Sequence, residues 1–213
     1  METLVIIDFE TTGLSPGQGD RATEIAAIVL QDRCIVRRYQ SLMNAGVRVP
    51  PFITEFTGIT NEMVRRAPPA ALVMNEVADF VGDLPIVAHN ASFDQKFWEA
   101  ELALIRRTSK QPFACSMLAA RRLYPDAPNH KLGTLATFAR LPNIGKAHRA
   151  MVDAEITTHL LNHMEDTVAQ RFQIQPLSHA ILRHIQRAKV TDLENSLQRL
   201  KLSLQKREEK GAR

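Results

Sequence analysis

Residues 4–14 read Leu4-Val5-Ile6-Ile7-Asp8-Phe9-Glu10-Thr11-Thr12-Gly13-Leu14, an apolar run that contains two carboxylates. Alternate side chains of a β-strand point to opposite faces, so Asp8 and Glu10 share one face while Val5, Ile7 and Phe9 share the other. Burial penalises both charges and the carboxylates repel each other, so a pair that stays ionised requires a cation between its oxygens. Mg²⁺ or Mn²⁺ fits, because hard divalent ions prefer carboxylate oxygens and water. Taken alone, the two acids are also consistent with the end of a core strand that turns into solvent.

Turn residues divide the rest of the chain into an ordered series of elements. Strands are expected at residues 3–9, 22–31, 34–43 and 85–89, with a further short strand at 113–115. Residues 49–69 are expected to form a loop with short helical turns, followed by helices at 71–83, 91–107, 116–123, 131–140 and 149–169. This order predicts an α/β fold in which a central mixed five-stranded sheet is flanked by helices.

The composition is that of a globular protein whose charge is unevenly distributed. The chain has 213 residues, of which 45% are hydrophobic, enough for one core of ordinary size. No stretch has the length of a membrane span and the N-terminus lacks a signal-like apolar run, so we expect a cytoplasmic protein without membrane contact. Residues 1–170 hold 17 Lys and Arg against 19 Asp and Glu, whereas residues 171–213 hold 10 against 4. We therefore expect a domain at 1–170 and a basic helical C-terminal extension at 171–213.

The extension contains leucines at steps of four, three and four: Leu193, Leu197, Leu200 and Leu204. This spacing places them on one stripe of a basic amphipathic helix. Three interpretations stay open: the helix packs back onto the domain, it binds a partner protein, or it pairs with a second copy in a homodimer. A basic extension also suits contact with nucleic acid, although solvated Lys and Arg are the more common meaning of such a run.

Two later segments supply further candidate site residues. Asp94 follows the fourth predicted strand and lies in the first turn of the next helix, where the helix dipole favours an anion. Asp153 lies on the helical face that is apolar further along the chain, so this carboxylate faces the core and needs a partner. His148 would lie about 140° from Asp153 on a regular helix, so we expect it on the preceding loop. Alone, Asp94 is an ordinary first-turn acid and His148 an exposed loop residue.

Together, Asp8-x-Glu10, Asp94 and His148-x-Ala150-x-x-Asp153 resemble the three motifs of the DEDDh (DnaQ-like) exonucleases. This group is similar to the proofreading subunit of bacterial DNA polymerase III, and the resemblance covers residues 3 to about 165. It implies a ribonuclease H-like fold and a two-metal phosphodiesterase that releases 5′-mononucleotides from 3′ ends. Asp8, Glu10 and Asp153 would hold one Mg²⁺ or Mn²⁺ ion, Asp8 would bridge to a second, and Asp94 would assist the second. His148 would take the proton from the attacking water.

The resemblance also extends to six residues expected to contact the substrate: Thr11, Thr12, Gly13, Leu14, Phe56 and Asn90. The first three match a turn whose backbone approaches the terminal 3′-hydroxyl, and Leu14 matches an apolar wedge against the last bases. Phe56 is expected to stack on a base, which is worth about 1 to 3 kcal/mol without sequence preference. The alternative for Phe56 is simple packing under a proline-rich loop. Asn90 is expected to form a hydrogen bond near the site.

These features favour a metal-dependent 3′-to-5′ exonuclease that acts on DNA 3′ ends in DNA repair or proofreading. The same motifs serve exoribonucleases that trim RNA 3′ ends, and the two differ in contacts to the 2′-hydroxyl, which the sequence does not locate. A third interpretation, from a different class, is an accessory protein of a polymerase or repair complex that binds through the C-terminal helix.

Overall fold

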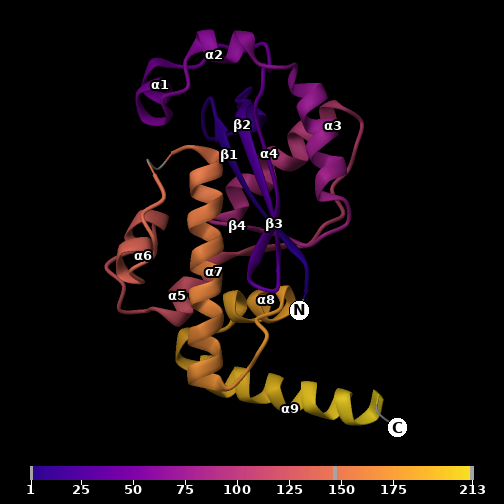
Figure 1. Ribbon diagram of the computed structural model, residues 1–213, viewed down its shortest axis with the longest axis vertical. Coiled ribbons are helices and arrows are strands. Elements are labelled where there is room, and N and C mark those ends of the chain that lie inside the picture. The colour runs from indigo at the N-terminus through magenta and orange to yellow at the C-terminus, as the bar shows by residue number, and fades with distance from the viewer. Residues whose placement is uncertain (1, 146–147, 212–213) are drawn as a thin grey trace.

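The computed structural model describes residues 2–145 and 148–211, and the side chains up to residue 203. A single mixed sheet lies at its centre, with α7 on one side of it and α3 and α4 on the other (Figure 1). Five strands form this sheet: β1 (Leu4–Thr11), β2 (Ala22–Gln31), β3 (Cys34–Leu42), β4 (Ile86–Ala88) and β5 (Phe113–Cys115). Their order is β3-β2-β1-β4-β5, with β1, β4 and β5 parallel and β2 antiparallel to both of its neighbours. The predicted mixed five-stranded sheet is therefore confirmed.

The helices follow the predicted order closely. They are α1 (Pro51–Thr57), α2 (Asn61–Arg66), α3 (Ala70–Val81), α4 (Ala91–Leu104), α5 (Ser116–Leu123), α6 (Leu132–Phe138), α7 (Ala150–Phe172), α8 (His179–Arg187) and α9 (Leu193–Gly211), with 3₁₀ turns η1 (Pro16–Gln18) and η2 (Val190–Asp192). α4 ends three residues earlier than predicted, because Arg106 adopts a left-handed conformation with φ of 58°. α7 runs to Phe172, past the expected domain boundary at residue 170.

Strand β1 separates two halves of the core. Val5, Ile7 and Phe9 pack in the cluster that contains the inner faces of α3 and α4. Leu4 and Ile6 pack in the other cluster, which contains the inner face of α7. The alternation predicted for this strand is therefore confirmed, and Asp8 and Glu10 continue the face that looks toward α7.

The C-terminal segment packs on the α7 side of the core. Leu193 and Leu197 are buried there and Leu200 lies against it, so the first of the three interpretations holds for these leucines; the Leu204 side chain lies outside the described residues. α8 covers the open edge of the sheet, where Gln186 Oε1 accepts a hydrogen bond of 2.6 Å from the Cys115 backbone N–H of edge strand β5. An edge strand paired in this way cannot recruit another strand at that position. Among the described residues, no helix is long and apolar enough to span a membrane.

The burial of α9 leads to a stability prediction with a control in the same helix. Leu197 is fully buried, whereas Leu202 is 58% exposed. We expect Leu197→Ala to lower the free energy of unfolding by about 2 to 5 kcal/mol, because a buried leucine leaves a cavity. Leu202→Ala is expected to change it by no more than about 0.5 kcal/mol. Urea denaturation measures both values, and equal effects of the two substitutions would show that α9 does not dock.

Candidate active site

Three of the candidate carboxylates converge from two elements. Asp8 and Glu10 lie on β1 and Asp153 lies in the first turn of α7, and one oxygen atom from each lies within 4.8 Å of the others. Asp94 lies in the first turn of α4, and its Oδ1 accepts a 3.2 Å hydrogen bond from the Phe9 backbone N–H. All four line one cleft of about 210 Å³. The structure thus brings together the four acids singled out in the sequence.

His148 lines the same cleft from the bend before α7, as expected from its spacing. Its backbone N–H donates to Asp153 Oδ2 at 3.1 Å, and its ring lies against the Phe56 ring of α1 with centroids 3.8 Å apart. The backbone of His148 has a φ of 67°, which costs free energy for a residue other than glycine and is common at functional sites. Backbone and ring are therefore both held at the cleft.

Four of the six predicted substrate-contact residues line the cleft. Thr11 and Gly13 form its floor beside the acids, while Leu14 and Phe56 are 76% and 54% exposed at its rim. The exposure of Phe56 rules out simple packing under the proline-rich loop. A Cβ at Gly13 would overlap the Asp20 carboxylate, which accepts a hydrogen bond from the Ser15 N–H and closes the turn.

The other two residues do not reach the cleft. Thr12 is buried, and its Oγ1 accepts a 3.0 Å hydrogen bond from the Arg21 N–H, so its role is to hold the turn after β1. Asn90 is exposed and is not among the residues that line the cleft. Its left-handed backbone, with φ of 68°, directs the chain from β4 into α4.

Sequence reasoning missed a buried ion pair beside the acids. Glu24 is directly opposite Glu10 in the β1–β2 register and is 1% exposed. Arg149 grips it with two hydrogen bonds, Nη2–Oε1 at 2.7 Å and Nε–Oε2 at 3.1 Å. Burial opposes ionisation of Glu24, but the hydrogen bonds from Arg149, Gln40 and the Ala150 backbone lower its pKa. The pair ties the start of α7 to β2 and so positions His148 and Asp153; the signal in the sequence was a lone acid within the apolar run 22–31.

The pKa values of the acids that line the cleft are raised, in contrast to that of Glu24. Burial, together with the charges of the neighbouring Asp153 and Glu24, raises the pKa of Glu10 to about 8. Burial likewise raises the pKa of Asp94 to about 8, and burial together with Asp94, Asp153 and Glu10 raises that of Asp8 well above its ordinary value. Without a cation, the cleft therefore favours protonated carboxyl groups. A bound divalent ion would favour their charged forms.

These shifts make the stability of the metal-free protein depend on pH. Below pH 4.5, the ordinary pKa of a glutamate, Glu10 is protonated in both states and the stabilising effect of its raised pKa is fully present. As pH rises toward about 8, the unfolded chain releases the proton first, so the free energy of unfolding falls. We expect Glu10→Gln to reduce this fall in urea denaturation with a chelator. The exposed Glu62→Gln is the control, and identical pH profiles for the two variants would contradict the assignment.

Comparison with known sequences agrees with the motifs. A family model described as Exonuclease (RNase T) matches residues 5–161. The DNA polymerase III PolC-type protein of Clostridium perfringens is 37% identical over 157 residues, which cover 74% of this chain and 11% of that protein. The 3′-5′ exonuclease DinG of Bacillus subtilis is 35% identical over 160 residues, covering 73% of this chain and 17% of that protein. The chain thus spans only a small part of these relatives.

Solved structures with similar folds are also exonucleases. Exonuclease X in complex with 5′ overhanging duplex DNA is 27% identical with a TM-score of 0.66, over 86% of this chain and 99% of that one. Escherichia coli exonuclease I in complex with a dT13 oligonucleotide superposes with a TM-score of 0.68 at 18% identity, over 80% of this chain and 42% of that one, which shows the fold alone. Motifs, fold and family model agree: the chain belongs to the RNase T exonuclease family, within its DnaQ-like group.

Proposed function

We propose that this protein is a metal-dependent 3′-to-5′ exonuclease that hydrolyses DNA 3′ ends to 5′-mononucleotides in DNA repair or proofreading. The observation that carries the proposal is the convergence of Asp8, Glu10 and Asp153 within 4.8 Å, in a cleft that Asp94 and His148 also line. DNA is favoured over RNA because exonuclease X is described in complex with DNA, and the match covers 99% of exonuclease X and 86% of this chain. The PolC-type relatives support a setting beside a DNA polymerase.

The acidic cluster fits divalent metal ions, which enzymes of this family use. Its donors are all carboxylate oxygens, the ligands that Mg²⁺ and Mn²⁺ prefer, and the raised pKa values of Asp8 and Glu10 support a bound cation. Asp8, Glu10 and Asp153 would hold one ion, and Asp8 and Asp94 a second. Two such ions, when bound, stabilise negative charge on the attacking and leaving oxygens of the phosphodiester.

The protein's own side chains supply the proton transfer and the grip on the substrate. His148 accepts the proton from the attacking water, and the Phe56 ring and the Asp153 hydrogen bond hold it for this task. Leu14 and Phe56 present apolar surface at the rim, where the terminal base of the strand can stack. The polar turn at Thr11 and Gly13 faces the terminal sugar.

Substitution of the proposed ligands and base tests the mechanism. We expect Asp8→Asn to reduce turnover of a 5′-labelled oligonucleotide below detection, because a proposed bridging ligand is lost. His148→Gln is expected to slow it by about 10²- to 10⁴-fold, the usual contribution of a general base. Asp126→Asn removes an exposed carboxylate outside the cleft and serves as the control. Substantial activity of Asp8→Asn would refute the metal assignment.

The choice of DNA over RNA is tested separately. Matched DNA and RNA strands of the same sequence, each with a free 3′ end, are incubated with the protein and Mg²⁺, and release of mononucleotides is followed. We expect a higher kcat/KM for DNA. Faster hydrolysis of RNA would assign the protein as an exoribonuclease while leaving the proposed site unchanged, because the two activities share the same carboxylates and base.

A further inference from the structure

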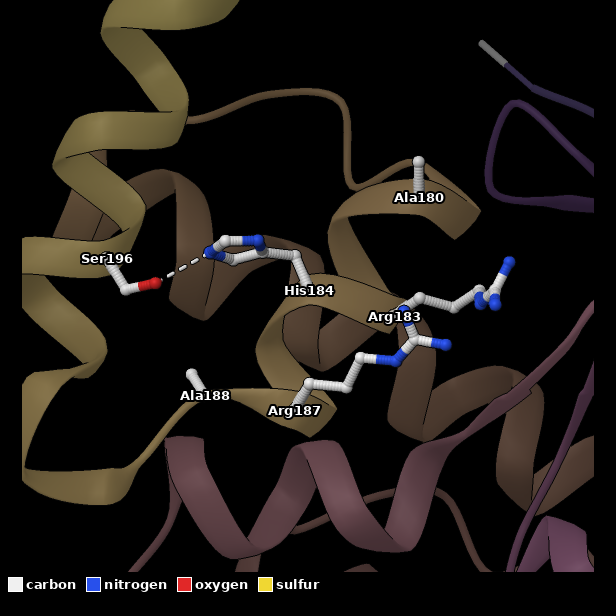
Figure 2. A pocket seen from close by; sticks show the side chains of 6 residues that line it. All are labelled: Ala180, Arg183, His184, Arg187, Ala188 and Ser196. Carbon is white, nitrogen blue, oxygen red and sulfur yellow. Dashed lines mark hydrogen bonds between the residues drawn. The ribbon is translucent and has the colours of Figure 1, made fainter.

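A basic pocket lies outside the cleft, on the helices of the C-terminal extension. It has a volume of about 370 Å³ and is lined by Ala180, Arg183, His184, Arg187, Ala188 and Ser196 (Figure 2). The first five come from α8 and the residue that follows it, and Ser196 comes from α9. A 2.7 Å hydrogen bond between His184 Nε2 and Ser196 Oγ joins the two helices. The pocket is therefore formed by the packing of α8 against α9.

The pocket carries positive charge that the described part of the chain leaves without a counter-charge. Arg183 and Arg187 lie one helical turn apart, and Figure 2 shows both guanidinium groups extending away from Ser196. Neither forms an ion pair with a described residue, and no carboxylate is among the lining residues. Arg183 Nε is buried without a hydrogen-bond partner among the described residues. An unpaired buried donor costs free energy unless a water or ligand satisfies it, and a charged donor favours an anion.

Some other arginines of the described chain differ from Arg183 and Arg187 because they have hydrogen-bond or ion-pair partners. Arg21 and Arg149 each pair with a buried glutamate, and Arg122 donates to the Leu118 and Ala188 carbonyls at the wall of the pocket. Arg122 thus adds a third positive charge beside the pocket. Glu2, Asp32 and Glu165 lie near the opposite, N-terminal end of α8, where Glu2 accepts a hydrogen bond from the His179 N–H.

The end of α8 that carries the pocket connects to the cleft. Gln186, next to Arg187, accepts the hydrogen bond from Cys115 at the C-terminal end of β5. The next residue, Ser116, is bonded through Oγ to His89 Nδ1 at 2.9 Å, and His89 lines the cleft. In Figure 1, α8 and the start of α9 lie at the other end of the long axis from α1 and the start of α7, so only a strand of several nucleotides could reach both pocket and cleft.

We propose that this pocket binds backbone phosphates of the nucleic-acid strand whose 3′ end occupies the cleft, a proposal that rests on the exonuclease function. Guanidinium groups match phosphate with paired N–H donors and stay charged at any physiological pH. The lining contains no Phe, Tyr or Trp, and its one aromatic ring, His184, is tied to Ser196 by a hydrogen bond, so we expect a phosphate contact that is independent of sequence. The pocket acts as a remote grip that short products cannot reach.

The test measures binding without cleavage, by fluorescence anisotropy of labelled single strands in the presence of a chelator. For a strand of about 16 nucleotides, we expect the double substitution Arg183→Gln and Arg187→Gln to weaken binding about tenfold, because two charge-assisted phosphate contacts are lost. The slope of log affinity against log salt should fall by about 1.4, or 0.7 per contact. A strand of about 4 nucleotides should bind both proteins equally.

Three controls make the result specific. Arg37→Gln with Arg38→Gln removes the same charge from β3, the opposite edge of the sheet, and should have a smaller effect. Arg183→Lys with Arg187→Lys should retain most of the affinity. Arg187→Gln alone, at an exposed position, replaces the double variant if thermal unfolding shows that variant to be destabilised, and should lower the slope by about 0.7.

Several outcomes would overturn the proposal. One is unchanged binding of the longer strand by the glutamine variants, and another is an equal loss for both strand lengths. A third is calorimetric binding of inorganic phosphate that the variants lose while strand binding is kept, which would make the pocket a site for free phosphate. Hydrolysis by the unsubstituted protein with Mg²⁺ is measured separately, so failure of the exonuclease function is distinguishable from failure of the remote grip.

Discussion

The main constraint on this structure is the mutual repulsion of carboxylates that β1 and the neighbouring elements bury close together. Asp8, Glu10, Asp94 and Asp153 line one small cleft, and Glu24 lies directly opposite Glu10 on the neighbouring strand β2. Among these five acids, the described residues give an ion pair to Glu24 alone, through the paired hydrogen bonds from Arg149. The division is chemically useful, because Glu24 stays ionised and holds α7 in place while the cleft keeps its affinity for external positive charge. One ion pair thus separates a structural acid from the proposed metal ligands.

The parts of the site that follow from local periodicity could be predicted from the sequence. The alternation of β1 placed Asp8 and Glu10 on one face, and the helical spacing from Asp153 placed His148 on a loop. Contacts between distant segments could not be predicted in this way. The pairing of Glu24 with Arg149 depends on the β1–β2 register and on where α7 begins, and the contact of Phe56 with His148 joins segments 92 residues apart. Thr12 and Asn90 show the converse, because their motif positions are matched while their side chains serve the turn or face solvent.

The C-terminal segment is a second case in which the sequence could not predict a contact between distant segments. Its leucine spacing predicted an amphipathic helix, but the spacing is identical for a helix that docks on its own domain and for one that docks on a partner. The choice is made by geometry, because α7 and β5 leave an apolar face and an open strand edge that α8 and α9 cover. Covering that edge requires α8 to direct its apolar residues inward, so its basic residues face outward as a group. The grouping of Arg183 and Arg187 is thus a consequence of how the sheet is closed.

The proposed metal site in the acidic cleft and the proposed phosphate contacts of the basic extension would have complementary roles toward a polyanion. A nucleic-acid strand that approaches four carboxylates meets repulsion, and divalent ions in the cleft act only on the phosphates next to the reaction. Phosphates further along the strand would need cations elsewhere, and residues 1–170 include more acidic than basic side chains. In the proposed arrangement, the excess of Lys and Arg in residues 171–213 would supply such charge at a distance from the proposed metal site, where it could not compete with the ions for the carboxylates. Placing the proposed strand affinity and metal affinity on separate surfaces would let each be strong without weakening the other.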